Sequence, residues 1–294
     1  MRRAVASVTG AAPVGRTVSA AGRFAASRGF VADLFADVRA SPRLARRIFL
    51  RGLRQEYRHS ILGIVLAFAP VALTALVIAF GRRAQIFSEE IGGVHAAFFG
   101  AFGILLAQAF SEAYASTQRL FTANAALLKR QNVAIEAPIV ASLVDAAFRD
   151  LVRLAVIGIL MAVFHVSPSP WFPLAAWGLL GVSLAGAALG LAAAPFAALT
   201  ADLQLVARGL MVVVITVTPV FVILPPDSAF GRVQQAIPLS WAFDGIRAAA
   251  YGGSGSLWAA ALAMPCSLAF VAFGAFLCRL ARPHVIERMT GGGA

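Results

Sequence analysis

Four charged side chains within one otherwise apolar stretch are the residues best placed to carry chemistry. They are Asp145, Arg149, Asp150 and Arg153, and offsets of three and four residues relate them, so a helix would place them on one side. In one interpretation the two arginines flank the path of an anionic substrate and the aspartates hold them in place, because charges at membrane depth face a partner or a wet cavity. In the other, residues 138–150 form a cytoplasmic extension whose ion pairs are solvated.

Residue types that serve catalysis or metal binding are sparse in the rest of the chain. The four histidines are scattered over different segments, and none belongs to the H-E-x-x-H pattern of a zinc enzyme. The only lysine, Lys129, follows a leucine, so the glycine-lysine pair of a phosphate-binding P-loop is absent. We therefore expect no catalytic residue and no metal or cofactor bound by this chain. A partner or a gradient would then supply the energy.

The composition excludes a soluble domain. Hydrophobic residues make up 60% of the chain and charged residues 13%, whereas about 25% of residues in soluble domains are charged. Twelve of the 25 basic residues lie in the first 60 positions, so the net charge of +12 is mostly an N-terminal property. We expect membrane lipids as the acidic partner and no nucleic acid, because the aromatic residues lie inside apolar runs.

Six apolar runs are long enough to cross a bilayer, which takes about 20 helical residues. They are residues 61–80, 93–111, 138–164, 171–199, 205–224 and 257–278. Most basic residues near the ends of these runs fall on one side, which places both termini in the cytoplasm. The sequence therefore predicts an all-α, multi-pass membrane protein with six transmembrane helices over residues 61–279, followed by a cytoplasmic tail over residues 280–294.

Small residues recur every fourth position in the fourth apolar run, at Gly186, Gly190 and Ala194. Small side chains at this spacing let two helix backbones approach closely. The pattern predicts tight helix packing, either inside the subunit or between two copies of it.

Residues 225–256 have a pattern unlike that of a spanning helix. Two prolines open the segment, residues 237–243 are apolar but too few to cross a bilayer, and a glycine-rich stretch closes it. We expect a re-entrant helical hairpin that enters the membrane partway from the outer side, shielded by protein. A plain extracellular loop is the alternative.

Residues 41–60 are predicted to form an amphipathic helix in the plane of the lipid headgroups, because Ser41 and Pro42 suit a helix start and arginines lie opposite apolar residues. The candidate interfacial residues are Arg47, Arg51, Arg54, Tyr57 and Arg58. This helix is either a lever joined to the first span or a simple anchor. Residues 1–40 read as a basic, disordered tail, and a transit peptide over residues 1–30 is the alternative.

The segment 118–138 between the second and third runs holds more apolar residues than an idle loop needs. The large apolar residues of this segment are too few to span a bilayer and too many for a fully solvated connection. They are Leu120, Phe121, Leu127 and Leu128. We expect a short helix that docks into a groove of another protein.

Three patches occur in a fixed order over about residues 45–280. Residues 53–70 contain Tyr-Arg before Ser-Ile-Leu-Gly and an inner proline, residues 124–138 contain Leu-Leu-Lys-Arg and a later glutamate, and residues 218–252 contain Thr-Pro-Val-Phe, Ile-Pro-Leu and Gly-Ile-Arg. In this order and spacing the chain resembles the permease subunits of ABC exporters of the ABC-2 type. The resemblance is greatest to those that move O-antigen, capsule and teichoic-acid polymers.

The resemblance implies half of a homodimeric pore in a bacterial inner (plasma) membrane. A second copy of the chain and two ABC ATPase subunits, which use ATP and Mg, would together export a lipid-linked polysaccharide. The implied ATPase-coupling residues are Asn124, Leu127, Leu128, Lys129, Arg130 and Glu136. Candidate pore-lining residues are Asp145, Arg149, Arg153, Phe98, Phe102 and Trp241, and those of an outer gate are Pro219, Pro238, Asp244 and Arg247.

Two other functions stay open. A gradient-driven carrier of small molecules would show an inverted repeat and more spans, and no convincing repeat is seen. A membrane enzyme of lipid-linked glycan synthesis would need clustered acids or histidines near one interface. Only residues 145–153 offer such a cluster, without a nucleophile or a metal set.

Overall fold

The computed structural model of the chain describes residues 42–57, 90–91, 93–130, 135–220, 227–253 and 255–291. Several expectations therefore lie outside the described residues: the tail over residues 1–40, the first span over residues 61–80, and Arg58. The same holds for the side chains of Tyr57, Lys129 and Arg130.

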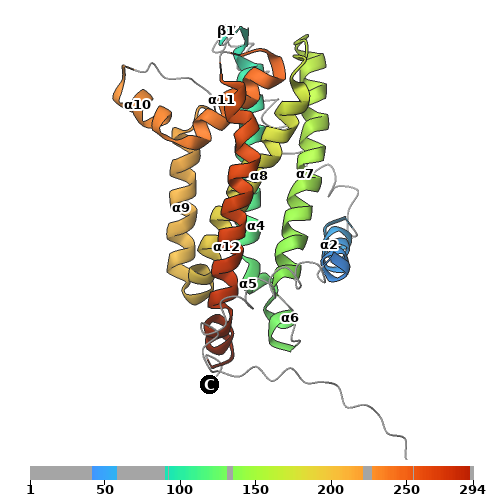
Figure 1. The fold of residues 1–294 in the computed structure, drawn as a ribbon, viewed down its shortest axis with the longest axis vertical. Helices are drawn as coiled ribbons and strands as arrows, with labels where there is room; N and C mark the ends of the chain where they lie inside the picture. Colours follow the sequence, from blue (N-terminus) through green and yellow to red (C-terminus); the bar gives the residue numbers. More distant parts are fainter. Residues whose placement is uncertain are drawn as a thin grey trace, which may run out of the picture.

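The described part of the chain is mostly helical, which confirms the predicted class at that level. Within it, three helices are long and apolar enough to cross a membrane: α4 (Ala96–Gln118), α8 (Phe172–Leu199) and α12 (Leu257–Gly291). A short antiparallel ribbon of β1 (Glu90–Ile91) and β2 (Val94–His95) precedes α4. The long helices run side by side along one axis (Figure 1).

Helix α8 lies at the centre, packed against α4 and α12. Small residues make this possible. A Cβ atom on Gly186 would overlap the backbone carbonyl of Phe110 in α4, and a Cβ atom on Gly181 would lie 2.5 Å from the backbone nitrogen of Met264 in α12. Backbones can approach this closely only where the side chain is missing. The small residues predicted to allow close packing therefore act inside the subunit.

Two further helices flank this centre. Helix α7 (Glu136–Val163) packs against α4, and α9 (Ala201–Val217) packs against α8 on the other side of the bundle (Figure 1). Both overlap predicted spans, but α9 ends at Val217 whereas the fifth run was expected to continue to about residue 224.

Short helices occupy the two ends of the bundle. Helices α5 (Leu120–Ala123) and α6 (Ala125–Arg130) lie at one end, and α10 (Ala229–Ala236) and α11 (Pro238–Tyr251) lie at the other (Figure 1). We call these the α5–α6 end and the α10–α11 end. Helix α12 extends past the predicted span, so the expected tail is helical as far as Gly291.

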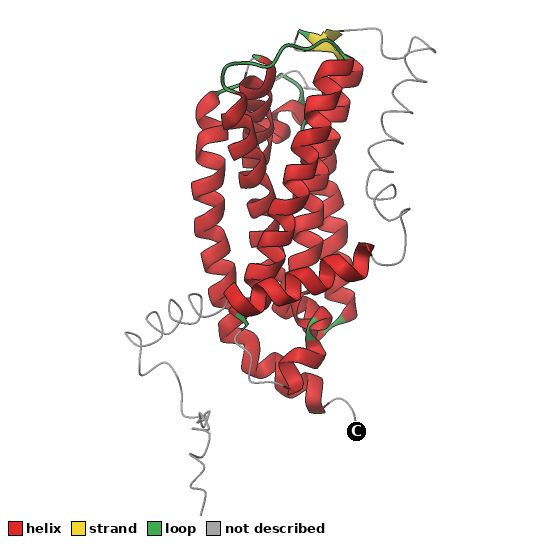
Figure 2. Ribbon diagram, turned by 90° about the vertical axis from the view of Figure 1, so that its right-hand side faces the viewer, coloured by secondary structure: helices red, strands yellow, loops and turns green. Residues whose placement is uncertain are grey.

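Helix α2 (Pro42–Tyr57) begins at the predicted residue and lies across the bundle axis, in front of the bundle in Figure 2. It packs on α7, where the ring of Phe49 meets that of Phe148 edge-on at 6.0 Å between centroids. Ala45 is buried on this side. The arginines of the opposite side are exposed: Arg43, Arg46, Arg47, Arg51 and Arg54.

Candidate functional site

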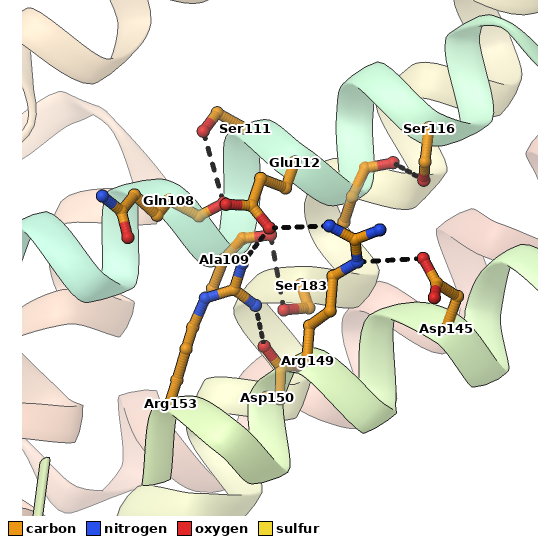
Figure 3. A network of polar contacts seen from close by, with 11 residues as sticks. Gln108, Ala109, Ser111, Glu112, Ser116, Asp145, Arg149, Asp150, Arg153 and Ser183 are labelled. Carbon is orange, nitrogen blue, oxygen red and sulfur yellow. Dashed lines mark hydrogen bonds and ion pairs between the residues drawn. The ribbon is translucent and has the colours of Figure 1, made fainter. Parts of the chain in front are cut away.

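A network of charged residues joins α4 to α7 (Figure 3). Arg153 donates through Nη1 to Oδ1 of Asp150 at 2.7 Å and through Nη2 to Oε2 of Glu112. Arg149 donates through Nε to Oδ2 of Asp145 at 3.0 Å, and its Nη1 lies 3.7 Å from the same glutamate oxygen. Both arginines of α7 therefore converge on one carboxylate of α4.

Helix geometry explains why these groups meet. Side chains on a helix lean toward its N-terminus, so Arg153 reaches back one turn toward Asp150. Ser183 of α8 donates to the backbone carbonyl of Ala109, one turn before Glu112, at 3.4 Å. Three helices thus surround the inner part of the network.

Burial divides the network into two parts. The side chains of Asp150 and Arg153 are 0% and 8% exposed, whereas those of Arg149 and Glu112 are 38% and 43% exposed. Arg153 is enclosed between two carboxylates of its own chain. That Arg153 lines a substrate path stays a prediction. Arg149 and Asp145 lie at the accessible edge, where the prediction stays open.

Sequence reasoning missed Glu112. We took it as the end of the second apolar run, but α4 continues to Gln118 and so places this glutamate inside the helix, facing α7. The available signal was an acid without a partner on its own helix. Its arginine lies 41 residues away along the chain, and helical spacing alone cannot identify such a pair.

The aromatic candidates for a pore differ in exposure. Phe98 and Phe102 are 0% and 1% exposed and belong to the main hydrophobic core, where both rings meet Tyr251. They hold α4 to α11 in this structure, and that they line a pore stays a prediction. Trp241 is 58% exposed at the start of α11.

The predicted coupling segment is packed more tightly against its own chain than we expected. Leu120, Phe121 and Leu128 are buried in a second core cluster with residues of α8 and α12, such as Val285. Leu127 is only partly covered. The chain itself therefore covers most of these apolar residues, and docking of this segment into another protein stays a prediction.

Two polar residues of the same segment also act within the chain. Glu136 is buried and pairs with Arg279 of α12 at 2.8 Å. Asn124 donates through Nδ2 to the carbonyl of Leu120 and so closes the end of α5. Glu136 is not available to a partner, contrary to the prediction. Among the side chains of α5 and α6 that the structure describes, those of Thr122, Ala123 and Ala126 are exposed.

At the α10–α11 end, three of the four predicted gate residues come together. Arg247 of α11 donates through Nη1 to the carbonyl of Pro219 at 2.6 Å and through Nη2 to the carbonyl of Val220 at 3.0 Å. Its Nη1 also lies 3.4 Å from Oδ1 of Asp244. The fourth residue, Pro238, is the first residue of α11, where its fixed φ suits a helix start.

The chain just after α9 explains this arrangement. Helix α9 ends at Val217, so the carbonyls of Pro219 and Val220 belong to non-helical chain. A buried carbonyl needs a hydrogen-bond donor, and the guanidinium group of Arg247 donates to both. Arg247 also stacks on the Phe99 ring of α4, 3.7 Å from its centroid. A Cβ atom on Gly103 would overlap the Val220 carbonyl, so glycine is required there. Burial raises the pKa of the Asp244 carboxyl, and Arg247 opposes this rise.

Comparisons with known proteins identify no relative: no family model matches the chain, and no curated protein matches it. Within the described ranges, no group of three or more His, Cys, Asp or Glu residues is arranged to hold a metal ion. The candidate site therefore has two parts, the α4–α7 charged network and a second cluster that we call the Arg247 clamp. The clamp consists of Arg247 and the groups that it contacts: the carbonyls of Pro219 and Val220, the carboxylate of Asp244 and the ring of Phe99.

Proposed function

We propose that this chain is the membrane permease subunit of an ATP-driven exporter of the ABC-2 type, acting on a lipid-linked polysaccharide. It works as a pair with a second copy and takes its energy from two separate ATPase subunits. The observation that carries the proposal is the placement of short helices: α5 and α6 connect α4 to α7 at one end, and the α10–α11 pair lies at the opposite end.

The distribution of tryptophan and arginine supports a bilayer around the bundle. All four tryptophans are at least 45% exposed, and three of them lie near the starts of α8, α11 and α12 at the α10–α11 end: Trp171, Trp241 and Trp258. Tryptophan is enriched where lipid meets water. On α12, Trp258 and Arg279 are 21 residues apart, or about 32 Å. The hydrocarbon layer is about 30 Å thick.

The position of α2 supports the same placement from the other side. It lies across the bundle toward the α5–α6 end, with its apolar side on α7 and its arginines exposed (Figures 1 and 2). Such a helix suits the headgroup layer on the cytoplasmic side, where anionic lipids attract basic residues. In this arrangement the α10–α11 pair is the outer re-entrant hairpin.

The charged network then has a mechanical role. Arg153 and its two carboxylates tie α4 to α7, so the two helices move as one body. The Arg247 clamp ties the outer hairpin to the end of α9 and to α4. A push on α5 and α6 from an ATPase is thus passed along α4 to the outer hairpin.

Co-purification from the native host tests the proposal. The tagged chain should bring down a subunit that contains a phosphate-binding Gly-rich loop and hydrolyses ATP. Ala126→Asp, at an exposed position of α6, should weaken this association. Ala236→Asp, the same change at an exposed position of α10, is the matched control and should not. Transport by the purified chain without any ATPase would refute the proposal.

A further inference from the structure

An apolar cavity of about 460 Å³ lies between α8, α9, α12 and the start of α11. Residues with small side chains form its wall on α8: Gly181, Ala185, Ala188 and Ala192. On the opposite wall, α12 contributes Ala263 and Phe270. The polar side chains in this lining are those of Ser267 and Cys266. Among the side chains that the structure describes, the lining has no charged group, which favours an apolar ligand.

The depth of the cavity indicates its occupant. Ala185 follows Trp171, the boundary tryptophan at the start of α8, by 14 residues, or about 21 Å toward the interior of the bilayer. At that depth in the proposed placement, the surrounding medium is the hydrocarbon layer. The start of α11 covers the cavity on the side of the headgroups through Pro238 and Leu239.

The width of the cavity separates a lipid chain from a protein helix. The wall from Gly181 to Ala192 is about 16 Å long. Spread over that length, the volume corresponds to a channel roughly 6 to 9 Å across, whereas a helix with its side chains needs about 10–12 Å. The space is thus narrower than a whole helix and wide enough for a single hydrocarbon chain.

We infer that this cavity is a binding site for one hydrocarbon chain of a membrane lipid, held between α8 and α12 beneath the α10–α11 hairpin. The inference rests on the bilayer placement in the proposed function and does not depend on export or on an ATPase. A chain bound there contacts α8, α12 and Leu239 of α11 together. Its presence therefore stabilises the hairpin against the bundle.

Lipid photo-crosslinking tests this site. The full chain is reconstituted in nanodiscs that contain phosphatidylglycerol with a diazirine on one acyl chain, and adducts are mapped by mass spectrometry. Leu189, Cys266 and Phe270 line the cavity, and we expect about threefold more adduct on them than on Leu151 and Ile159. The last two are exposed on α7 and contact bulk lipid. A concave site encloses most of its ligand, which lengthens contact.

Two variants that fill the cavity sharpen the test. Ala192→Phe and Ala242→Phe both add a ring to the lining, so the result stands if either one folds. Each should lower the adducts on Cys266 and Phe270 to the level of α7. Ala269→Phe, at an exposed position of α12 outside the lining, should leave them unchanged.

Equal labelling of cavity and α7 residues in the unmodified chain would overturn the inference, and so would adducts that the filling variants leave intact. Disulfide formation between Cys266 residues of two copies, with loss of lipid adducts, would show that a second copy covers this surface and would also overturn it. Adducts on α7 but not on the cavity residues would contradict the lipid site while supporting the bilayer placement. Association with an ATPase is measured in a separate experiment, so a failure of this inference can be told apart from a failure of the proposed function.

Discussion

Replacing Arg153 by methionine removes the one cation that lies between Asp150 and Glu112 while keeping an apolar side chain of similar length. Asp150 is 0% exposed, so the substitution leaves a buried carboxylate without its counter-charge. Removing one partner of a buried ion pair destabilises a protein by about 3–5 kcal/mol. We expect a loss of that size in the free energy of unfolding.

The matched control is Arg149→Met on the same helix. The Arg149 side chain is 38% exposed and pairs with carboxylates that are themselves 26% and 43% exposed. Exposed ion pairs contribute about 0–1 kcal/mol, because solvent screens them. The two substitutions remove the same charge from neighbouring turns, and the structure predicts that their costs differ about fivefold.

Unfolding of the chain in mixed micelles, followed by far-UV circular dichroism as a denaturing detergent is added, measures both costs. The double variant Asp150→Asn with Arg153→Met removes the stranded charge, so we expect it to be more stable than Arg153→Met alone by about 2 kcal/mol. Equal losses for the two arginine variants would refute the reasoning, and so would a double variant no more stable than Arg153→Met.

Three further predictions follow from buried contacts. Arg247→Gln should free the carbonyls of Pro219 and Val220, just after α9, and raise amide hydrogen exchange at Thr218 and Val220 at least tenfold, because each lost hydrogen bond to the charged group contributes about 1.5–3 kcal/mol; unchanged exchange would contradict the clamp. Leu128→Asp should unfold the α5–α6 end, since a charge would enter a core cluster, whereas Ala126→Asp should leave circular dichroism and thermal stability unchanged. Glu136→Gln should loosen the end of α12 around Arg279, visible as faster local exchange, and equal protection in both proteins would argue against the pair.

Local pattern was sufficient for much of the helical structure. The start of α2 followed from Ser41 and Pro42, and α7 and α8 lie close to the predicted bounds because prolines and charges interrupt the apolar runs. These signals act within a few residues of the chain, so sequence reasoning can detect them. The end of α9 was less well predicted, because the apolar run continues past Val217 whereas the helix ends there and the carbonyl of Pro219 after it accepts from Arg247.

The candidate site was predictable only in part. The stripe of Asp145, Arg149, Asp150 and Arg153 was visible because helical spacing places these residues on one side. Which of them is buried was not visible, since burial depends on α4 and α8. The exposure expected for Leu128 was wrong for the same reason. An apolar side chain in a connecting segment can be buried against its own chain or against another protein, and the sequence does not distinguish the two.

The amino-acid sequence by itself determined that the chain is helical and apolar and where charge interrupts its apolar runs. Only the tertiary structure decided which charges meet. Glu112 pairs with a residue 41 positions away, and Glu136 pairs with one 143 positions away. Hydrophobic burial has no direction and acts between any apolar faces. For α8, the choice of α4 and α12 as partners therefore rests on small residues such as Gly186 and Gly181, which let these backbones touch.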